Sequence, residues 1–188
     1  MSEQNFRQWL CASLISLPQD VKAVHRLAED PDLSDASREL ASGSIIHLIG
    51  GSNAIPGTQG VMSLADDVLM FRIVLGRIMK NDPEALSSHI EAEPELLGKL
   101  EEHLAIMNSF LGECMRVLEK VVDGLSKLSH QGRKPNECVH DADGANWLYG
   151  AVQEALVDQL DLDDENIERE CRHVERIKAP LESRLATL

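Results

Sequence analysis

The fold of this chain is decided by residues 45–79, which read IIHLIGGSNAIPGTQGVMSLADDVLMFRIVLGRIM. The segment starts with an apolar helix end at 45–49, continues as a glycine-rich loop over 50–60, and then becomes apolar again after Asp66 and Asp67. Its glycines and Pro56 indicate backbone conformations that β-carbons would obstruct. The pattern therefore predicts two helices joined by a tight corner, and the second, at about 62–80, should be deeply buried because it is apolar on nearly every side.

The composition favours an all-α fold. The chain has 188 residues, of which only 3% are aromatic, whereas aliphatic residues are abundant. A core of aliphatic side chains packed between helices fits this composition, and the length suffices for one domain without disulfides. We expect a single domain over 1–188, a helical bundle of about six to seven helices, with an N-terminal unit at 1–80 and an acidic helical extension at 81–188.

The charge of the chain is uneven and excludes several kinds of partner. The net charge is −14, and residues 81–188 carry 23 acidic but only 11 basic side chains. Such a surface repels phosphate backbones and anionic lipid headgroups, so we expect no nucleic-acid binding. The most apolar segment, Val68 to Met79, is interrupted by Arg72 and Arg77 and is too short for a membrane span, so no stable membrane insertion is expected.

The cysteines and the N-terminus point to a reducing compartment. The N-terminal residues lack the basic start and unbroken apolar run of a signal peptide. The four cysteines are far apart in the sequence and form no C-x-x-C motif: Cys11, Cys114, Cys138 and Cys171. We therefore expect a reduced, cytoplasmic protein.

Apolar spacing and helix-end signals predict the helices on either side of the loop. Before the loop they predict helices over 3–16, ending before Pro18, then over 18–29, and over 35–49 with Ser34 as N-cap. After it, the signals predict a short helix over 82–92 and then helices over 94–130, 144–160 and 164–185, the last kinked or ended by Pro180.

The helix expected at about 94–130 is heptad-patterned. Its apolar residues alternate steps of three and four over more than four heptads: Leu97, Leu100, Leu104, Met107, Leu111, Cys114, Leu118, Val121, Leu125 and Leu128. We call these ten residues the seam. A straight helix of this length would extend roughly 55 Å. If the seam exceeds what the C-terminal helices can cover, we expect it to pair between two copies as a homodimer.

The order of motifs at about 22–80 resembles a known family. Asp30-Pro31 precedes a helix that ends in Ile46-His47-Leu48-Ile49, a turn follows with Ile55-Pro56-Gly57, and Leu64-Ala65-Asp66-Asp67 begins an apolar helix. This succession is similar to the YkvA-like family, a small bacterial helical domain of unknown function. The family's central motif reads roughly Ser-Pro-Ile-Asp-Leu-Ile-Pro-Asp, followed by a Gly and Leu-Asp-Asp. Asn53 and Gly57 stand where that motif has its two loop carboxylates, so the resemblance implies no acidic role for this loop.

The glycine-rich loop and the acid pair after it have structural explanations. A phosphate-binding loop would need a lysine and a preceding strand, and this loop has neither. Asp66 and Asp67 are neighbours on a helix and diverge by about 100°, which argues against a shared metal ligand role. As acids at a helix N-terminus they favour the macrodipole by about 0.3 to 1 kcal/mol. His47, in the apolar run before the loop, is expected to be a packed or surface histidine.

Two short motifs invite a metal interpretation. Cys171 and His173 are two residues apart on a helix, so their side chains point to different sides and cannot both bind one zinc ion. We therefore expect a core Cys171 and a surface His173. The same spacing occurs at Cys138 and His140. A second possibility is a metal-dependent phosphohydrolase of the HD type centred on His140-Asp141, with His89 or His103 and Asp158 as the further ligands.

The residues therefore favour binding over catalysis. Acidic side chains are dense between 158 and 168: Asp158, Asp161, Asp163, Asp164, Glu165 and Glu168. Such a group either forms a solvated turn or docks a basic partner. We expect a non-enzymatic protein–protein interaction module, an adaptor or regulator, that binds through the seam or the acidic C-terminal helices and needs no cofactor. The HD-type phosphohydrolase is the enzymatic alternative.

Overall fold

The computed structural model describes residues 3–188, in which the chain forms helices and loops and no β-strand. The predicted all-α class is confirmed. The α-helices are α1 (Glu3–Glu29), α2 (Asp35–Ile49), α3 (Ala65–Asn81), α4 (Ser87–Ala92), α5 (Leu100–Leu111), α6 (Met115–Val122), α7 (Pro135–His140), α8 (Ala142–Asp158), α9 (Asp164–Glu170) and α10 (Lys178–Leu185). Short 3-10 helices are η1 (Gly60–Leu64), η2 (Gly112–Cys114), η3 (Leu125–Lys127) and η4 (Cys171–Ile177).

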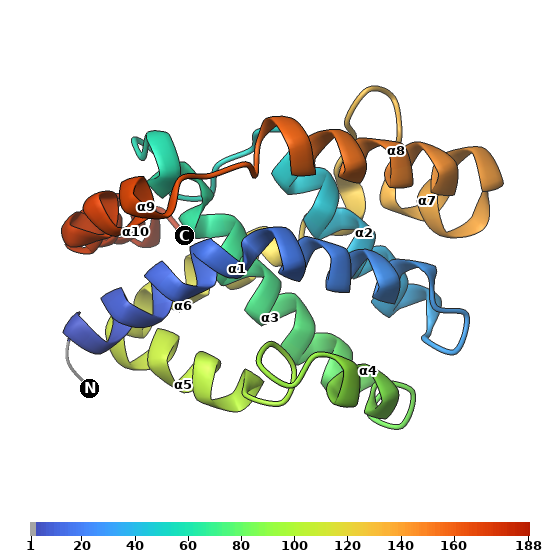
Figure 1. Ribbon diagram of the computed structural model, residues 1–188, viewed down its shortest axis with the longest axis horizontal. Helices are drawn as coiled ribbons and strands as arrows, with labels where there is room; N and C mark the ends of the chain where they lie inside the picture. Colours follow the sequence, from blue (N-terminus) through green and yellow to red (C-terminus); the bar gives the residue numbers. More distant parts are fainter. Residues whose placement is uncertain (1–2) are drawn as a thin grey trace.

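Helix α3 lies at the centre of the bundle. It contacts α1, α2, α5 and α6, and Figure 1 shows it passing through the middle of the molecule among them. Side chains on every side of α3 are buried, among them Val68, Phe71, Val74 and Leu75. The apolar pattern that predicted a deeply buried helix after the loop is thus confirmed.

Helix α1 is continuous through Pro18, where the sequence predicted a break. Proline removes one backbone hydrogen bond and crowds the preceding turn, at a cost of about 3 kcal/mol in a helix interior. The apolar stripe runs without interruption across this point, and Leu14, Leu17 and Val21 are all fully buried. Because burying each such side chain is worth about 1.5 to 3 kcal/mol, packing along the stripe offsets the local defect.

The long helix expected at about 94–130 is not formed. Helix α5 ends at Leu111, and Gly112 adopts φ 52° and ψ −130°, a conformation outside the helical region. The chain then continues through η2, α6 and η3 as separate short elements. Each of these short elements turns its apolar face to the same core. The heptad spacing therefore indicated which residues are buried, but it did not indicate a continuous helix.

The seam is covered within the chain. Leu100, Met107, Leu118 and Leu125 are almost completely buried. Helix α5 packs against α1 and α3, α6 against α3 and α10, and η3 against α2. Most of the seam is therefore packed inside the chain, and the homodimer stays a prediction.

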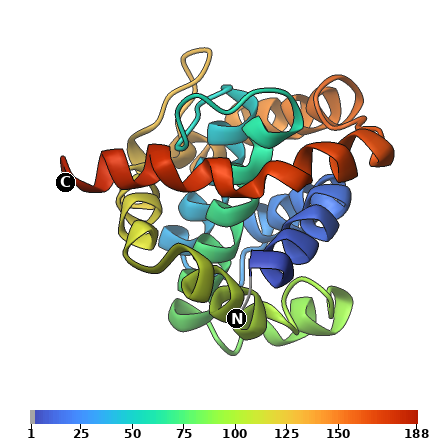
Figure 2. The same cartoon turned by 90° about the vertical axis from the view of Figure 1, so that its left-hand side faces the viewer.

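The C-terminal segment lies across one side of the molecule as a long rod, drawn in red in Figure 2. Pro180 neither ends nor kinks it, because the residue lies in the first turn of α10, where a missing N–H leaves no helical bond broken. The irregular residue is His173, with φ −112° and ψ 30° inside η4.

A buried ion pair joins α3 to α1. Arg72 Nη1 donates to Asp20 Oδ2 at 2.6 Å, and both side chains are almost fully enclosed. The sequence showed Arg72 only as an interruption of an apolar helix.

None of the helices formed by residues 3–188 combines the length and apolar composition that a bilayer span requires.

Replacing Leu111 with alanine tests whether the seam is buried in solution. We expect Leu111→Ala to lower the free energy of unfolding by about 2 to 5 kcal/mol in urea denaturation, because the truncation leaves a cavity in the core. The control Val157→Ala removes an exposed side chain and should change it by less than about 0.5 kcal/mol. Equal, small effects would mean that the seam is exposed.

Replacing Gly112 tests the break in the seam. No atom lies within 4 Å of the β-carbon that Gly112→Ala would add, so the substitution strains only the backbone and should cost about 1 to 3 kcal/mol. Gly150 lies in an exposed part of α8 with equally open space, and Gly150→Ala should stabilise the protein by about 0.5 to 1 kcal/mol. A stabilising Gly112→Ala would instead indicate a continuous helix.

Candidate functional site

Three ionisable side chains meet where α2 and α3 approach each other. His47 lies in the last turn of α2, and Asp66 and Asp67 lie in the first turn of α3. The loop at 50–60 reverses the chain between them, with Gly51 at φ 62° and Gly57 at φ 85°, conformations that suit glycine. The three side chains each offer one ligand atom, and these atoms lie within 4.8 Å of one another. We call these residues the His–Asp cluster.

Hydrogen bonds hold the cluster in place. His47 Nδ1 lies 3.0 Å from Asp67 Oδ1, within hydrogen-bond distance, and the Ala54 N–H donates to Asp66 Oδ2 at 2.6 Å. His47 Nε2 faces the same Asp66 oxygen at 3.9 Å, which is too long for a hydrogen bond. The cluster thus joins α2, the loop and α3. No hydrogen bond connects His47 Nε2 with Asp66.

This geometry corrects the sequence argument that Asp66 and Asp67 diverge too far to share a site. On a single helix the Cβ directions of Asp66 and Asp67 do diverge. His47 comes from another helix, and its two ring nitrogens face different carboxylates. Neighbouring residues on one helix can therefore meet the two edges of one imidazole.

Burial makes the cluster electrostatically costly. Asp66 is fully buried, Asp67 and His47 are nearly so, and Asp66 Oδ1 has no hydrogen-bond partner. Burial, followed by the charge of Asp67, raises the pKa of Asp66 to about 7, and burial also raises the pKa of Asp67. In the part of the chain that the structure describes, no lysine or arginine forms an ion pair with either carboxylate.

A pocket reaches the cluster from outside. It encloses about 280 Å³, and Asp67 is one of its lining residues. The loop contributes Gly51, Ser52 and Asn53 to the wall, and the segment after α8 contributes Leu162. Asp67 is therefore the point at which the buried cluster meets a cavity bordered by the glycine-rich loop.

The chemistry of the cluster suits cations. A neutral imidazole and two carboxylates can share a proton, or they can ligate a divalent ion, since imidazole suits transition metals and carboxylates suit hard cations. The sequence contains a signal that could have found the cluster. His47 interrupts an apolar helix end, and Asp66 and Asp67 are the first acidic residues that follow it, so they were the acidic partners that the next helix could offer a buried histidine.

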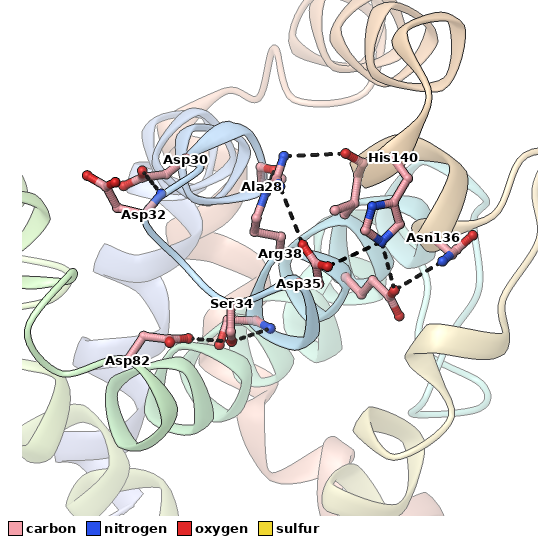
Figure 3. A network of polar contacts seen from close by, with 12 residues as sticks. Ala28, Asp30, Asp32, Ser34, Asp35, Arg38, Asp82, Asn136 and His140 are labelled. Atoms are coloured by element: carbon pink, nitrogen blue, oxygen red, sulfur yellow. Dashed lines mark hydrogen bonds and ion pairs between the residues drawn. The ribbon is translucent and has the colours of Figure 1, made fainter.

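His140 and Asp141, the centre of the HD-type alternative, make other contacts. His140 ends α7 with 46% of its side chain exposed, and its Nε2 lies 3.6 Å from Asp35 and 3.8 Å from Glu39 on α2 (Figure 3). Asp141 caps α8 by accepting from the Asp143 N–H, and it also pairs with Arg133.

The further ligands expected for that alternative are not gathered around His140. His89 bonds to Asp30 at 2.6 Å, and His103 lies buried against Trp9. Asp158 is at the opposite end of α8 from Asp141. Across residues 3–188 the His–Asp cluster is the one group of three or more ligating side chains that lie close enough to hold an ion.

The cysteine–histidine pairs are arranged as the helical spacing predicts. Cys171 is buried and His173 is exposed, so the predicted core and surface roles are confirmed. Cys138 is likewise buried while His140 is exposed. Cys11 lies near Cys171 across the interface of α1 and η4, and both side chains line one pocket.

The six acidic residues between 158 and 168 are all exposed. They lie on the last residue of α8, on the connecting loop and on α9. We call these six residues the acidic edge. Asp163 also caps α9 by accepting from the Asn166 N–H.

Comparison of the chain with protein-family models, curated proteins and solved structures found no match. The YkvA-like resemblance of residues 22–80 therefore stays a prediction.

Replacing Asp66 tests its elevated pKa in protein freed of metal with a chelator. Because the folded-state pKa of Asp66 lies above its value of about 3.8 in the unfolded chain, its contribution to stability is fully present below pH 4 and is lost as the pH rises through about 7. This loss should be on the order of a few kcal/mol.

Asp66→Asn keeps the shape and the acceptor for Ala54 but cannot ionise. We expect it to match the wild type in urea denaturation at pH 4 and to exceed it in unfolding free energy at pH 8. Parallel stability curves for the two proteins from pH 4 to 8 would contradict the elevated pKa.

Proposed function

We propose that this chain is a protein-interaction module that docks a lysine- or arginine-rich segment of a partner protein on the acidic edge. The observation that carries the proposal is that the carboxylates there are exposed and have no cationic partner within the described chain. All six are open to solvent, and within residues 3–188 none of them forms a salt bridge.

The density of charge at the edge favours a binding role. Six carboxylates within eleven consecutive positions repel one another, and capping α9 requires only Asp163. A basic segment would relieve this repulsion and exploit charges that already point into solvent. Arg169, which lies among them, instead contacts Asn166.

An apolar side chain beside the carboxylates adds a non-ionic contact. Val157, at the end of α8, is 71% exposed. It directly precedes Asp158. We therefore expect a partner segment in which basic residues accompany at least one apolar residue, because exposed ion pairs alone are each worth only about 0 to 1 kcal/mol.

The seam is not part of this surface, because α1, α3 and α10 cover it. The interaction is thereby assigned to the C-terminal acidic helices, one of the two surfaces that the sequence suggested.

Charge neutralisation with a matched control tests the proposal. The edge variant carries Asp161→Asn, Asp164→Asn, Glu165→Gln and Glu168→Gln, and keeps Asp163 for its capping role. The control variant carries Glu84→Gln, Glu91→Gln, Glu101→Gln and Glu102→Gln, four exposed acids outside the acidic edge, and so has the same net charge.

The probe is a synthetic peptide of alternating lysine and leucine, titrated by calorimetry at low and high salt. We expect the edge variant to bind it about tenfold more weakly than the wild type and the control variant to bind it nearly as well, with all affinities falling as salt rises. Equal weakening in both variants would show attraction by net charge alone and would reject a docking surface at the edge.

A further inference from the structure

We propose that the His–Asp cluster binds one divalent transition-metal ion of the Zn²⁺ class, held by His47 Nε2 and Asp66 between α2 and α3 while Asp67 positions the imidazole. The inference is separate from the docking function, since it concerns a buried site and a different ligand.

The spacing of the donors fits a metal ion. Zinc bonds to imidazole nitrogen and carboxylate oxygen measure about 2.0 to 2.2 Å. His47 Nε2 and Asp66 Oδ2 lie 3.9 Å apart, close to the sum of two such bonds. Asp67 lies at the other edge of the ring, 3.0 Å from His47 Nδ1, and so does not ligate this ion. The gap that is too wide for a hydrogen bond is therefore suited to an ion.

One oxygen of Asp66 has no partner. Asp66 Oδ2 is anchored by the Ala54 N–H, whereas Asp66 Oδ1 is fully buried and accepts no hydrogen bond. Leaving a buried polar atom unsatisfied costs about 1 to 3 kcal/mol, and more for a charged group. A metal ion supplies the partner that the protein does not.

The charge of the cluster also calls for a cation. Two ionised carboxylates carry one more negative charge than a protonated His47 can neutralise, and no lysine or arginine of the described chain pairs with either. Either a proton on one carboxylate or a divalent ion restores the balance. The experiment below separates these two occupants.

The hydrogen bond between Asp67 and His47 orients the imidazole for binding. With its proton on Nδ1, the ring donates to Asp67 and turns the lone pair of Nε2 toward Asp66. A carboxylate that holds the second ring nitrogen of a ligating histidine is a common arrangement at metal sites, where it fixes the tautomer and strengthens the ligand.

An ion can reach the site through the pocket that Asp67 lines. Gln159 and Leu162 form part of its wall, and the same segment carries Asp158, Asp161 and Asp163. These exposed carboxylates create a negative potential that raises the local concentration of cations. Two ligating residues leave coordination positions free for water or another small ligand.

Calorimetric titration with ZnCl₂ of the full chain, freed of metal with EDTA and then dialysed, tests the proposal. We expect one equivalent to bind and to raise the thermal midpoint. Asp66→Asn, which keeps the shape of the site, should weaken binding more than 100-fold, and Asp67→Asn should weaken it about 10- to 100-fold. His140→Ala, which removes the exposed histidine beside Asp35 and Glu39, should bind as the wild type does.

Two results would overturn the proposal in favour of a defined alternative. If the wild type binds no zinc while Asp66→Asn is more stable than the wild type at pH 8, a proton is the sole occupant. If zinc binding is lost in His140→Ala, the ion lies at the surface of α7.

Cobalt(II) absorption of the wild type needs no variant and so remains decisive even if a substitution prevents folding. Ligand-field bands without thiolate charge transfer are expected for nitrogen and carboxylate donors. Thiolate charge transfer would place the ion at cysteines such as Cys11 and Cys171 and would overturn the assignment.

Discussion

The contact between His47 and Asp67 connects the two helices on which the rest of the bundle is built. It joins the last turn of α2 to the first turn of α3, and the neighbouring bond from Ala54 to Asp66 fixes the loop between them. Helix α3 in turn receives α1, α5 and α6 on its other sides. The direction in which α3 enters the core, and hence the position of every element packed on it, depends on a polar contact that is almost completely removed from water.

The two buried polar contacts of α3 differ in their charge balance. Arg72 meets Asp20 on α1 as a pair of opposite charges, so the desolvation of each is offset by the other. The His–Asp cluster has two carboxylates for one imidazole and an oxygen with no partner. Arg72 Nε also lacks a partner, but the ion pair is balanced in charge without a ligand, whereas the cluster needs a proton or a cation. This difference is why the cluster, and not the ion pair, is the site assigned a ligand.

The acidic edge and the cluster share one region of the molecule. The segment that follows α8 carries carboxylates into solvent and also supplies Gln159 and Leu162 to the pocket beside Asp67. A partner docked on the edge would therefore lie near the entrance of that pocket. Surface charge of this kind is weakened by salt, whereas the buried donors are shielded from it, so the two features respond differently to the same solution.

The sequence by itself determined the helical class, the corner at 50–60, the deeply buried segment after it and the exposed acids near 158–168, because each follows from local spacing and composition. It did not determine that α1 passes through Pro18 or that the seam breaks at Gly112, since packing of the apolar faces decided both. The His–Asp cluster lay furthest from prediction. His47 and Asp67 are twenty positions apart, and whether they meet depends on the angle between α2 and α3, which only the tertiary structure decides. Periodicity identifies the face of a helix that is buried, but the residue that it meets is chosen by how the helices cross.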